Sequence, residues 1–313
     1  MVILPSVRHL RHLVALADHE HFGHAAAACH VTQSTLSASI KELEALLEAG
    51  LVDRTKRRVV FTPLGLETVS RARKIIAELE ELADAARASR EPLSGTVRMG
   101  VIPTIGPYLL PRLLPGLRRA YVRLKLYLIE DLTARLIEAL HEGKLDLALL
   151  ALPYECGAVE TWILFEDAFL VAFPRSRALA NEVHITPKQL MNEELLLLKD
   201  GHCLRDHALA ACHLAGRRQA EAFEATSLPT LVQMADNGLG TTLLPAIAVK
   251  AGLLRGTGLI TRPFVSDNPA REIGLVWRKG TGRRHEFLVL AEELARRASQ
   301  NSSKKAGARL QAL

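Results

Sequence analysis

Two of the four cysteines, Cys203 and Cys212, lie nine positions apart in residues 195–216. Four leucines at 195–198 are typical of a short buried strand, residues 199–201 of a turn, and the apolar spacing up to Gly216 of a helix. Cys203 is therefore predicted at a helix N-terminus. There the helix dipole and the basic neighbours Lys199, His202 and Arg205 favour a thiolate, the reactive form of cysteine. The alternative is a small apolar side chain at a loop-to-helix junction.

The spacing of this pair limits what the two thiols can do. In a continuous helix, residues nine apart are separated by about 13 Å along the axis and by roughly half a turn. A disulfide requires Cα atoms within about 7 Å. Either these thiols never pair, or pairing unwinds the helix and moves whatever packs on it, which would be a redox switch. The other two cysteines, Cys29 and Cys156, are expected to be packed thiols.

The 313-residue chain, with 49% hydrophobic residues, predicts at least two domains with buried cores. No apolar run is long enough to span a bilayer, and basic residues interrupt residues 1–17, so a cytoplasmic protein is expected. In that reducing compartment a transient, redox-sensing disulfide is more natural than a structural one. The net charge of +6 suggests an anionic partner, but residues 1–65 carry seven Lys/Arg against six Asp/Glu, so charge alone is a weak argument.

Residues 1–65 show a compact helical pattern followed by a short ribbon at 52–62. Thr32 is a good N-cap for a third helix, whose inner stripe is Leu36, Ile40, Leu43 and Leu47. This is the layout of a winged helix-turn-helix, although an ordinary helical bundle with a polar surface has the same spacing. The outer face of the third helix and the basic ribbon supply the candidate DNA-binding residues, which are Thr32, Gln33, Ser34, Thr35, Ser37, Lys41, Arg54, Arg57 and Arg58.

Residues 66–91 predict one long linker helix, because its apolar residues alternate spacings of three and four, the period of a dimerising coiled coil. Residues 92–300 then read as an α/β domain of two lobes around a cleft. Buried strands are expected over 97–102, 124–129, 145–152, 169–173, 195–198, 241–244 and 273–277, and helices over 109–120, 132–142, 228–237 and 283–297. The basic tail, 301–313, is expected to be disordered.

Several motifs resemble those of LysR-type transcriptional regulators. In the first domain they are Ala15-Leu16-Ala17, His21-Phe22 and Thr32-Gln33-Ser34-Thr35-Leu36-Ser37. The segments Gly100-Val101-Ile102-Pro103-Thr104, Gly201-His202-Cys203-Leu204-Arg205-Asp206 and Ala225-Thr226-Ser227-Leu228 are similar to those of the peroxide-sensing members. The resemblance covers nearly the whole chain, but Ser34 stands where a proline is common and Ala222 where a histidine is frequent.

The resemblance implies a fold, partners and roles. The fold would be a winged helix-turn-helix, a linker helix and a two-lobed, periplasmic-binding-protein-like α/β regulatory domain. The partners would be promoter DNA, three further copies in a homotetramer, hydrogen peroxide, RNA polymerase and a thioredoxin- or glutaredoxin-type reductant. Cys203 would be the peroxidatic cysteine and Cys212 the resolving one. Peroxide binding or thiolate stabilisation would fall to Thr104, Thr133, His202, Arg205 and Arg271.

No metal or organic cofactor is needed for that chemistry, and the six histidines of residues 1–30 match no common zinc spacing. Two other functions stay open. One is a LysR-type regulator that binds a metabolite in its cleft, with incidental cysteines. The other is a thiol peroxidase, against which the absence of a Cys-x-x-Cys motif and the presence of a winged helix argue. A regulator rather than an enzyme is therefore expected.

Overall fold

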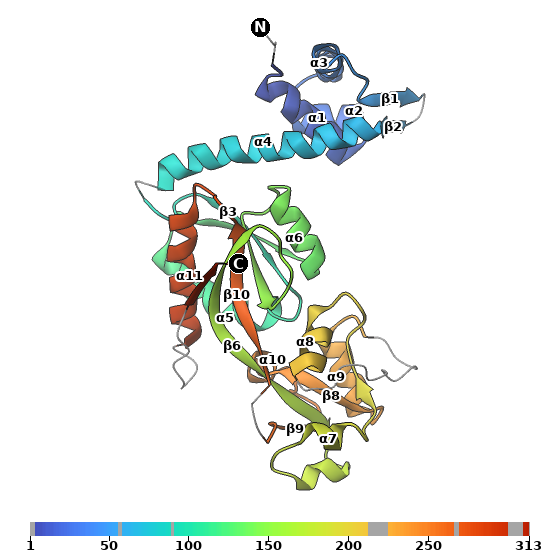
Figure 1. Cartoon of the computed structure of the whole chain (residues 1–313), viewed down its shortest axis with the longest axis vertical. Coiled ribbons are helices and arrows are strands. Elements are labelled where there is room, and N and C mark those ends of the chain that lie inside the picture. Colours follow the sequence, from blue (N-terminus) through green and yellow to red (C-terminus); the bar gives the residue numbers. More distant parts are fainter. Residues whose placement is uncertain are drawn as a thin grey trace. The chain divides into compact units, whose positions relative to one another are not determined.

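A computed structural model of the chain describes residues 4–55, 58–88, 91–211, 225–265, 269–299 and 309–312 (Figure 1). The chain forms two compact units. The first contains Met1–Ala86 with His141–Lys144, and the second contains Arg87–Leu140 with Leu145–Leu313. No helix of the described residues is long and apolar enough to cross a membrane.

The first unit is a winged helix-turn-helix, as predicted. Its elements are α1 (Val7–His19), α2 (Phe22–Ala28), α3 (Gln33–Leu46), β1 (Val52–Thr55), β2 (Arg58–Phe61) and α4 (Pro63–Ala88). The Thr32 side chain accepts a hydrogen bond from the Thr35 N–H and so caps α3. Leu36, Ile40 and Leu43 are buried between the helices. The expected fourth member of this stripe, Leu47, is exposed instead, because α3 ends at Leu46 and the chain turns at Glu48 with a positive φ.

Helix α4 begins earlier than the predicted linker, since Pro63 occupies its first position, where a missing N–H costs nothing. Near its start, Val69 and Ala72 are buried. Further along, Leu79 and Leu82 are exposed. The apolar stripe of α4 is therefore only partly covered by its own chain.

The second unit contains a mixed sheet with helices packed around it. In the described residues the sheet has nine strands, and its main path runs β4-β3-β5-β10-β6-β8-β7, with β9 and β11 also paired to β6. The strands are β3 (Thr96–Val101), β4 (Lys125–Glu130), β5 (Leu147–Leu152), β6 (Val159–Pro174), β7 (Leu195–Leu196), β8 (Thr241–Pro245), β9 (Leu259–Arg262), β10 (Ala270–Arg278) and β11 (Arg309–Ala312). The helices are α5 (Gly106–Ala120), α6 (Thr133–His141), α7 (Pro187–Leu190), α8 (Cys203–Ala211), α9 (Leu228–Asp236), α10 (Ala246–Lys250) and α11 (Arg284–Ser299), with a 3-10 turn at Ala178–Asn181.

Two separate apolar cores divide this unit into two lobes, as the sequence predicts. The first core lies among β3, β5, β10, α5, α6 and α11, and the second among β7, β8, α8 and α9 (Figure 1). Strand β6 contributes to both, because it pairs with β10 up to Ala168 and with β8 from Phe169 onward. Tyr108 packs against both cores. The lobes therefore meet along long strands rather than at a single loop.

Three expectations for this unit were wrong in detail. Strand β4 was expected to be buried but is an exposed sheet edge, since it pairs only with β3 and leaves Tyr127 60% exposed. Strand β6 begins ten residues before the predicted 169–173 strand, because the preceding residues, 159–168, also pair, with β10. In the tail, Arg309–Ala312 were expected to be disordered but form β11 against β6, where the backbone finds hydrogen-bond partners.

Candidate functional site

Helix α8 places Cys203 at its first residue, as predicted. The turn before it is possible because Gly201 adopts a φ of +94°, which disfavours side chains with a Cβ. Cys203 is only 6% exposed and belongs to the first core, whereas the next residue, Leu204, and Ala208 belong to the second. The cysteine thus lies where the two lobes meet.

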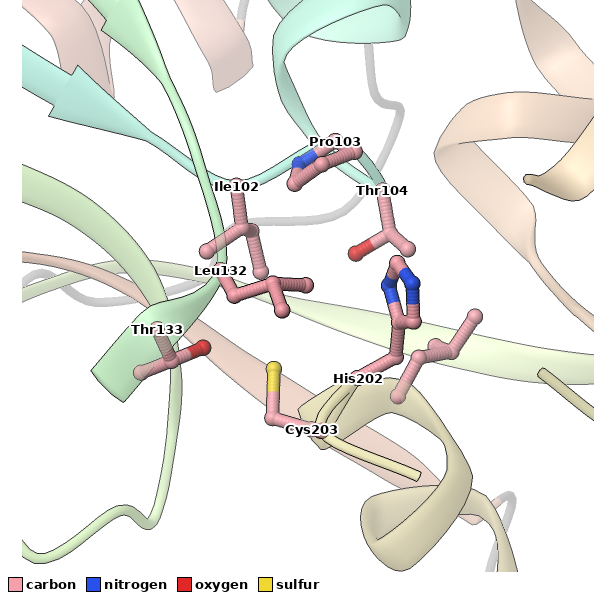
Figure 2. Close-up of a pocket in the computed structure, with 9 residues that line it drawn as sticks. Ile102, Pro103, Thr104, Leu132, Thr133, His202 and Cys203 are labelled. Atoms are coloured by element: carbon pink, nitrogen blue, oxygen red, sulfur yellow. The ribbon is translucent and has the colours of Figure 1, made fainter. Parts of the chain in front are cut away.

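The Cys203 sulfur faces a small pocket between the start of α8, the start of α6 and the loop after β3 (Figure 2). Figure 2 shows the Thr133 hydroxyl directed toward the Cys203 sulfur and the Thr104 side chain beside the His202 ring. The cavity volume is about 10 Å³, roughly the space of one water-sized molecule and far below the roughly 300–1,000 Å³ of sites for drug-sized ligands. The lining residues are Ile102, Pro103, Thr104, Leu132, Thr133, Gly201, His202, Cys203 and Leu204. The pocket therefore suits a ligand of a few atoms.

Arg271 holds the Thr104 wall of this pocket. Its Nη1 donates to Thr104 Oγ1 at 2.9 Å and its Nη2 to the Thr104 carbonyl at 3.1 Å. Behind it, Nε and Nη2 donate to Asp167 Oδ2 at 3.2 and 3.1 Å. Both charged side chains are fully buried. The predicted place of Arg271 at the site is consistent with its position behind Thr104 in the pocket wall.

The electrostatics of Cys203 differ from those expected at a helix N-terminus. Burial raises the pKa of its thiol above the ordinary value for cysteine. The Thr133 hydroxyl, the Arg271 guanidinium and a backbone N–H lower that pKa without cancelling the rise, and the Asp206 carboxylate adds to it. Thr133 Oγ1 is buried and makes no hydrogen bond of ordinary geometry in the described residues, so this hydroxyl is free to turn toward the sulfur. The resting thiol is therefore mostly protonated at neutral pH.

Two of the basic neighbours named from sequence do not supply positive charge to the sulfur. Burial lowers the pKa of His202, so its imidazole is neutral at physiological pH and acts as a polar group of the pocket wall. Arg205 does not line the pocket but forms an ion pair with Asp200 on the preceding turn. Its predicted role at the thiolate is not supported by this placement, because residues two apart on a helix point to different sides.

Cys212, the predicted resolving cysteine, lies outside the described residues, as does Ala222. Sequence reasoning missed Asp167, the carboxylate partner of Arg271. It also missed His207, whose Nε2 lies 2.7 Å from the Pro153 carbonyl and fixes α8 against the loop after β5. The available signal for Asp167 was a charge directly before the apolar run 168–173.

The residues predicted to contact DNA lie mostly on exposed surface of the first unit. Gln33, Ser34, Thr35 and Lys41 are exposed on α3, and Ser37 is half-buried. Thr32 uses its hydroxyl within the cap, bonding to Ser34 Oγ, Thr35 Oγ1 and the Thr35 N–H. The backbones of Arg54 and Arg58 belong to the paired strands β1 and β2 of the wing. Arg57 lies outside the described residues. In the described part of the chain, no group of three His, Cys, Asp or Glu side chains could hold a metal ion.

Comparison with protein families defines the class. Residues 7–66 match the "Bacterial regulatory helix-turn-helix protein, lysR family", and residues 90–299 match the "LysR substrate binding domain". The chain belongs to the LysR family of DNA-binding transcriptional regulators.

Within this family, its similarity is to OxyR proteins. It is 42% identical to the "DNA-binding transcriptional dual regulator OxyR" of Escherichia coli strain K12, over 93% of this chain and 95% of the relative. A full-length OxyR variant from Pseudomonas aeruginosa superimposes with a TM-score of 0.80 at 33% identity, covering 97% of this chain and 100% of that chain. A Corynebacterium glutamicum OxyR mutant described as H2O2-bound matches with a TM-score of 0.66 at 31% identity, covering 96% and 94%.

Replacing Thr133 with valine should raise the pKa of Cys203 further, because the thiolate loses its hydroxyl donor. A hydrogen bond to a charged group contributes about 1.5–3 kcal/mol, so a midpoint shift of about one to two pH units toward alkaline pH is expected. Thiolate absorbance as a function of pH, in a chain whose other cysteines are serine, measures this. Thr161→Val, buried in β6 away from the pocket lining, is the control. An unchanged midpoint in Thr133→Val would show that the hydroxyl does not contact the thiolate.

Proposed function

We propose that the chain is a transcriptional regulator that senses hydrogen peroxide through Cys203. The observation that supports this most is the sulfur directed into a small, hydroxyl-lined pocket at the start of α8. A two-oxygen oxidant is close in size to such a space, whereas a metabolite of ordinary size requires a much larger one. The similarity to the Corynebacterium glutamicum OxyR mutant described as H2O2-bound supports the same ligand.

The chemistry begins with attack of the Cys203 thiolate on one peroxide oxygen. The O–O bond breaks, the sulfur becomes a sulfenic acid, and the other oxygen leaves as hydroxide, which takes up a proton. Thr104, Thr133 and His202 supply the polar groups that align the O–O bond with the sulfur. A thiol of raised pKa is less ionised, but its thiolate is intrinsically more nucleophilic, which offsets part of the loss.

The second step is condensation of the sulfenic acid with the Cys212 thiol, which forms a disulfide and releases water. Nine positions separate the two residues, so residues 203–211 cannot stay helical when the disulfide closes. Because α8 contributes to both cores, its rearrangement changes how the lobes pack. A dithiol reductant of the thioredoxin or glutaredoxin type would restore the thiols in the cytoplasm.

Thiol trapping with intact-protein mass spectrometry tests this sequence of steps. After one equivalent of peroxide, the wild type is expected to contain a Cys203–Cys212 disulfide, and Cys212→Ser a trapped sulfenic acid at Cys203. Cys156→Ser is the matched control, because Cys156 is equally buried in the first core and should not be needed. Unmodified thiols in the wild type would favour a metabolite-responsive regulator instead. Sustained peroxide turnover in a chain that does not bind DNA would favour a thiol peroxidase.

DNA contact is proposed for the exposed side chains of α3, with the wing arginines on adjacent phosphates. Gln33→Ala should weaken binding to a specific site by about 1–3 kcal/mol, roughly fivefold to a hundredfold or more, if its amide reads a base edge. A mobility-shift titration at fixed salt measures the loss. Glu67→Ala on α4, whose carboxylate pairs with Arg71 on the helix surface, should bind as the wild type does. Equal affinities for Gln33→Ala and wild type would remove α3 from the base-reading role.

Self-association into a dimer of dimers is proposed from the apolar surfaces that one chain leaves exposed. On the sheet edge they include Tyr127, Leu128 and Ile129 of β4, and on the linker helix Leu79 and Leu82. Monomeric proteins seldom expose contiguous apolar side chains of this kind. Sedimentation of the full chain measures the state directly, and a monomer at micromolar concentration would contradict it. RNA polymerase is the proposed partner at the promoter.

A further inference from the structure

Asp167 and Arg271 form a buried ion pair at the crossing between the lobes. They lie directly opposite each other in the β6–β10 ladder, and both side chains are fully buried. Asp167 Oδ2 accepts from two guanidinium nitrogens, and its Oδ1 accepts from the Ile247 N–H at 2.9 Å, at the start of α10. One carboxylate therefore joins β6, β10 and α10.

Stability alone does not account for this arrangement. The free energy lost when two charges leave water offsets much of their attraction, so an apolar pair of similar volume is often as stable as a buried ion pair or more so. Arg271 also has a specific task, since its other two hydrogen bonds go to the side chain and carbonyl of Thr104. Thr104 in turn lines the pocket that Cys203 faces. The chain of contacts runs from Asp167 through Arg271 to the pocket wall.

The charge of Arg271 also acts on the sulfur. Arg271 favours the Cys203 thiolate, and its positive charge has the Asp167 carboxylate as direct counter-charge. The other groups that influence Cys203 are Asp206 on α8 and the Thr133 hydroxyl on α6, with neutral His202 beside it and the Tyr154 phenol from the loop after β5. Burial raises the pKa of Asp167, and Arg271, the Ile247 N–H and, from α10, Lys250 oppose that rise. Both of its oxygens accept hydrogen bonds, as those of an ionised carboxylate do.

We propose that Asp167 is a positioning residue of the peroxide pocket, which holds Arg271 against Thr104 and offsets its charge so that Cys203 is only partly activated. The proposal rests on the proposed function for its biological meaning, but not for its measurement. Asp167 does not touch the reacting atoms and acts through Arg271. Its charge sets how much of the guanidinium's field reaches the sulfur.

Removal of the Asp167 charge should therefore make the cysteine more acidic. In Asp167→Asn the amide retains the shape of the carboxylate, while Arg271 and Lys250 keep their positive charges. The pKa of Cys203 should fall by about one unit, which gives roughly tenfold more thiolate at neutral pH. Asp167→Glu keeps the negative charge, so its Cys203 midpoint should lie close to that of the wild type.

The experiment is a thiolate absorbance titration of the full-length chain with Cys29, Cys156 and Cys212 replaced by serine, using Cys203→Ser as the blank. Asp146→Asn is the matched control, because Asp146 is a buried carboxylate of the same unit that pairs with buried Arg283, away from the pocket. It should lose stability without moving the Cys203 midpoint. An Asp167→Asn midpoint equal to or above that of the wild type would overturn the proposal.

A second comparison covers the case in which Asp167→Asn does not fold. The double variant Arg271→Gln/Asp167→Asn leaves a neutral pair, which buried sites tolerate better than a single uncompensated charge. Its Cys203 midpoint should lie below that of Arg271→Gln alone, in which the Asp167 anion remains. Equal midpoints would overturn the proposal. No peroxide is used in either titration, so failure of the peroxide function would show separately, as absent sulfenic acid with the titrations unaffected.

Discussion

Burial of Cys203 between two apolar cores is the constraint on which the rest of the site depends. The sulfur belongs to the first core, and the next residue of α8 belongs to the second. A sulfenic acid at this position places a polar oxygen where an apolar group packs, and an unsatisfied buried polar group costs about 1–3 kcal/mol. In the proposed switch, oxidation would therefore act first on the packing of α8, which contributes to both cores.

The same burial decides the electrostatics. A helix N-terminus favours an anion by about 0.3–1 kcal/mol, or up to about 2 kcal/mol in partly buried positions. Burial can shift a pKa by up to about 3–5 units, at about 1.36 kcal/mol each. Desolvation therefore wins at Cys203 even with Arg271 behind the pocket wall. In the proposed function, a buried and mostly protonated thiol would react only with a ligand small enough to enter the pocket and oriented by its hydroxyls, whereas an exposed thiolate would be oxidised by many oxidants.

Much of this fold could be predicted from sequence because it depends on local patterns. The cap at Thr32, the helical stripe at Leu36, Ile40 and Leu43, and Cys203 at the start of a helix all follow from residues within one or two turns. Apolar composition cannot tell a central strand from an edge strand, so the exposure of β4 was missed.

The site was harder to predict because its contacts are distant in sequence. Arg271 reaches Thr104 across 167 positions and Asp167 across 104. Arg205 lies close to Cys203 in sequence, yet its side chain pairs with Asp200. Proximity along the chain therefore assigned Arg205 a role at the sulfur that its placement does not support, and it gave no signal for Asp167. The resemblance to peroxide-sensing regulators pointed to Thr104 and Thr133, whose positions spacing alone could not relate to Cys203.

The most direct test of the regulatory switch is footprinting of the full chain on a DNA fragment selected for binding by the reduced protein. The wild type and Cys203→Ser should protect the same positions before peroxide is added. Peroxide should change the protected positions for the wild type only, and a dithiol reductant should restore the original pattern. The same peroxide-dependent change in Cys203→Ser, or no change in the wild type, would contradict a switch centred on this cysteine.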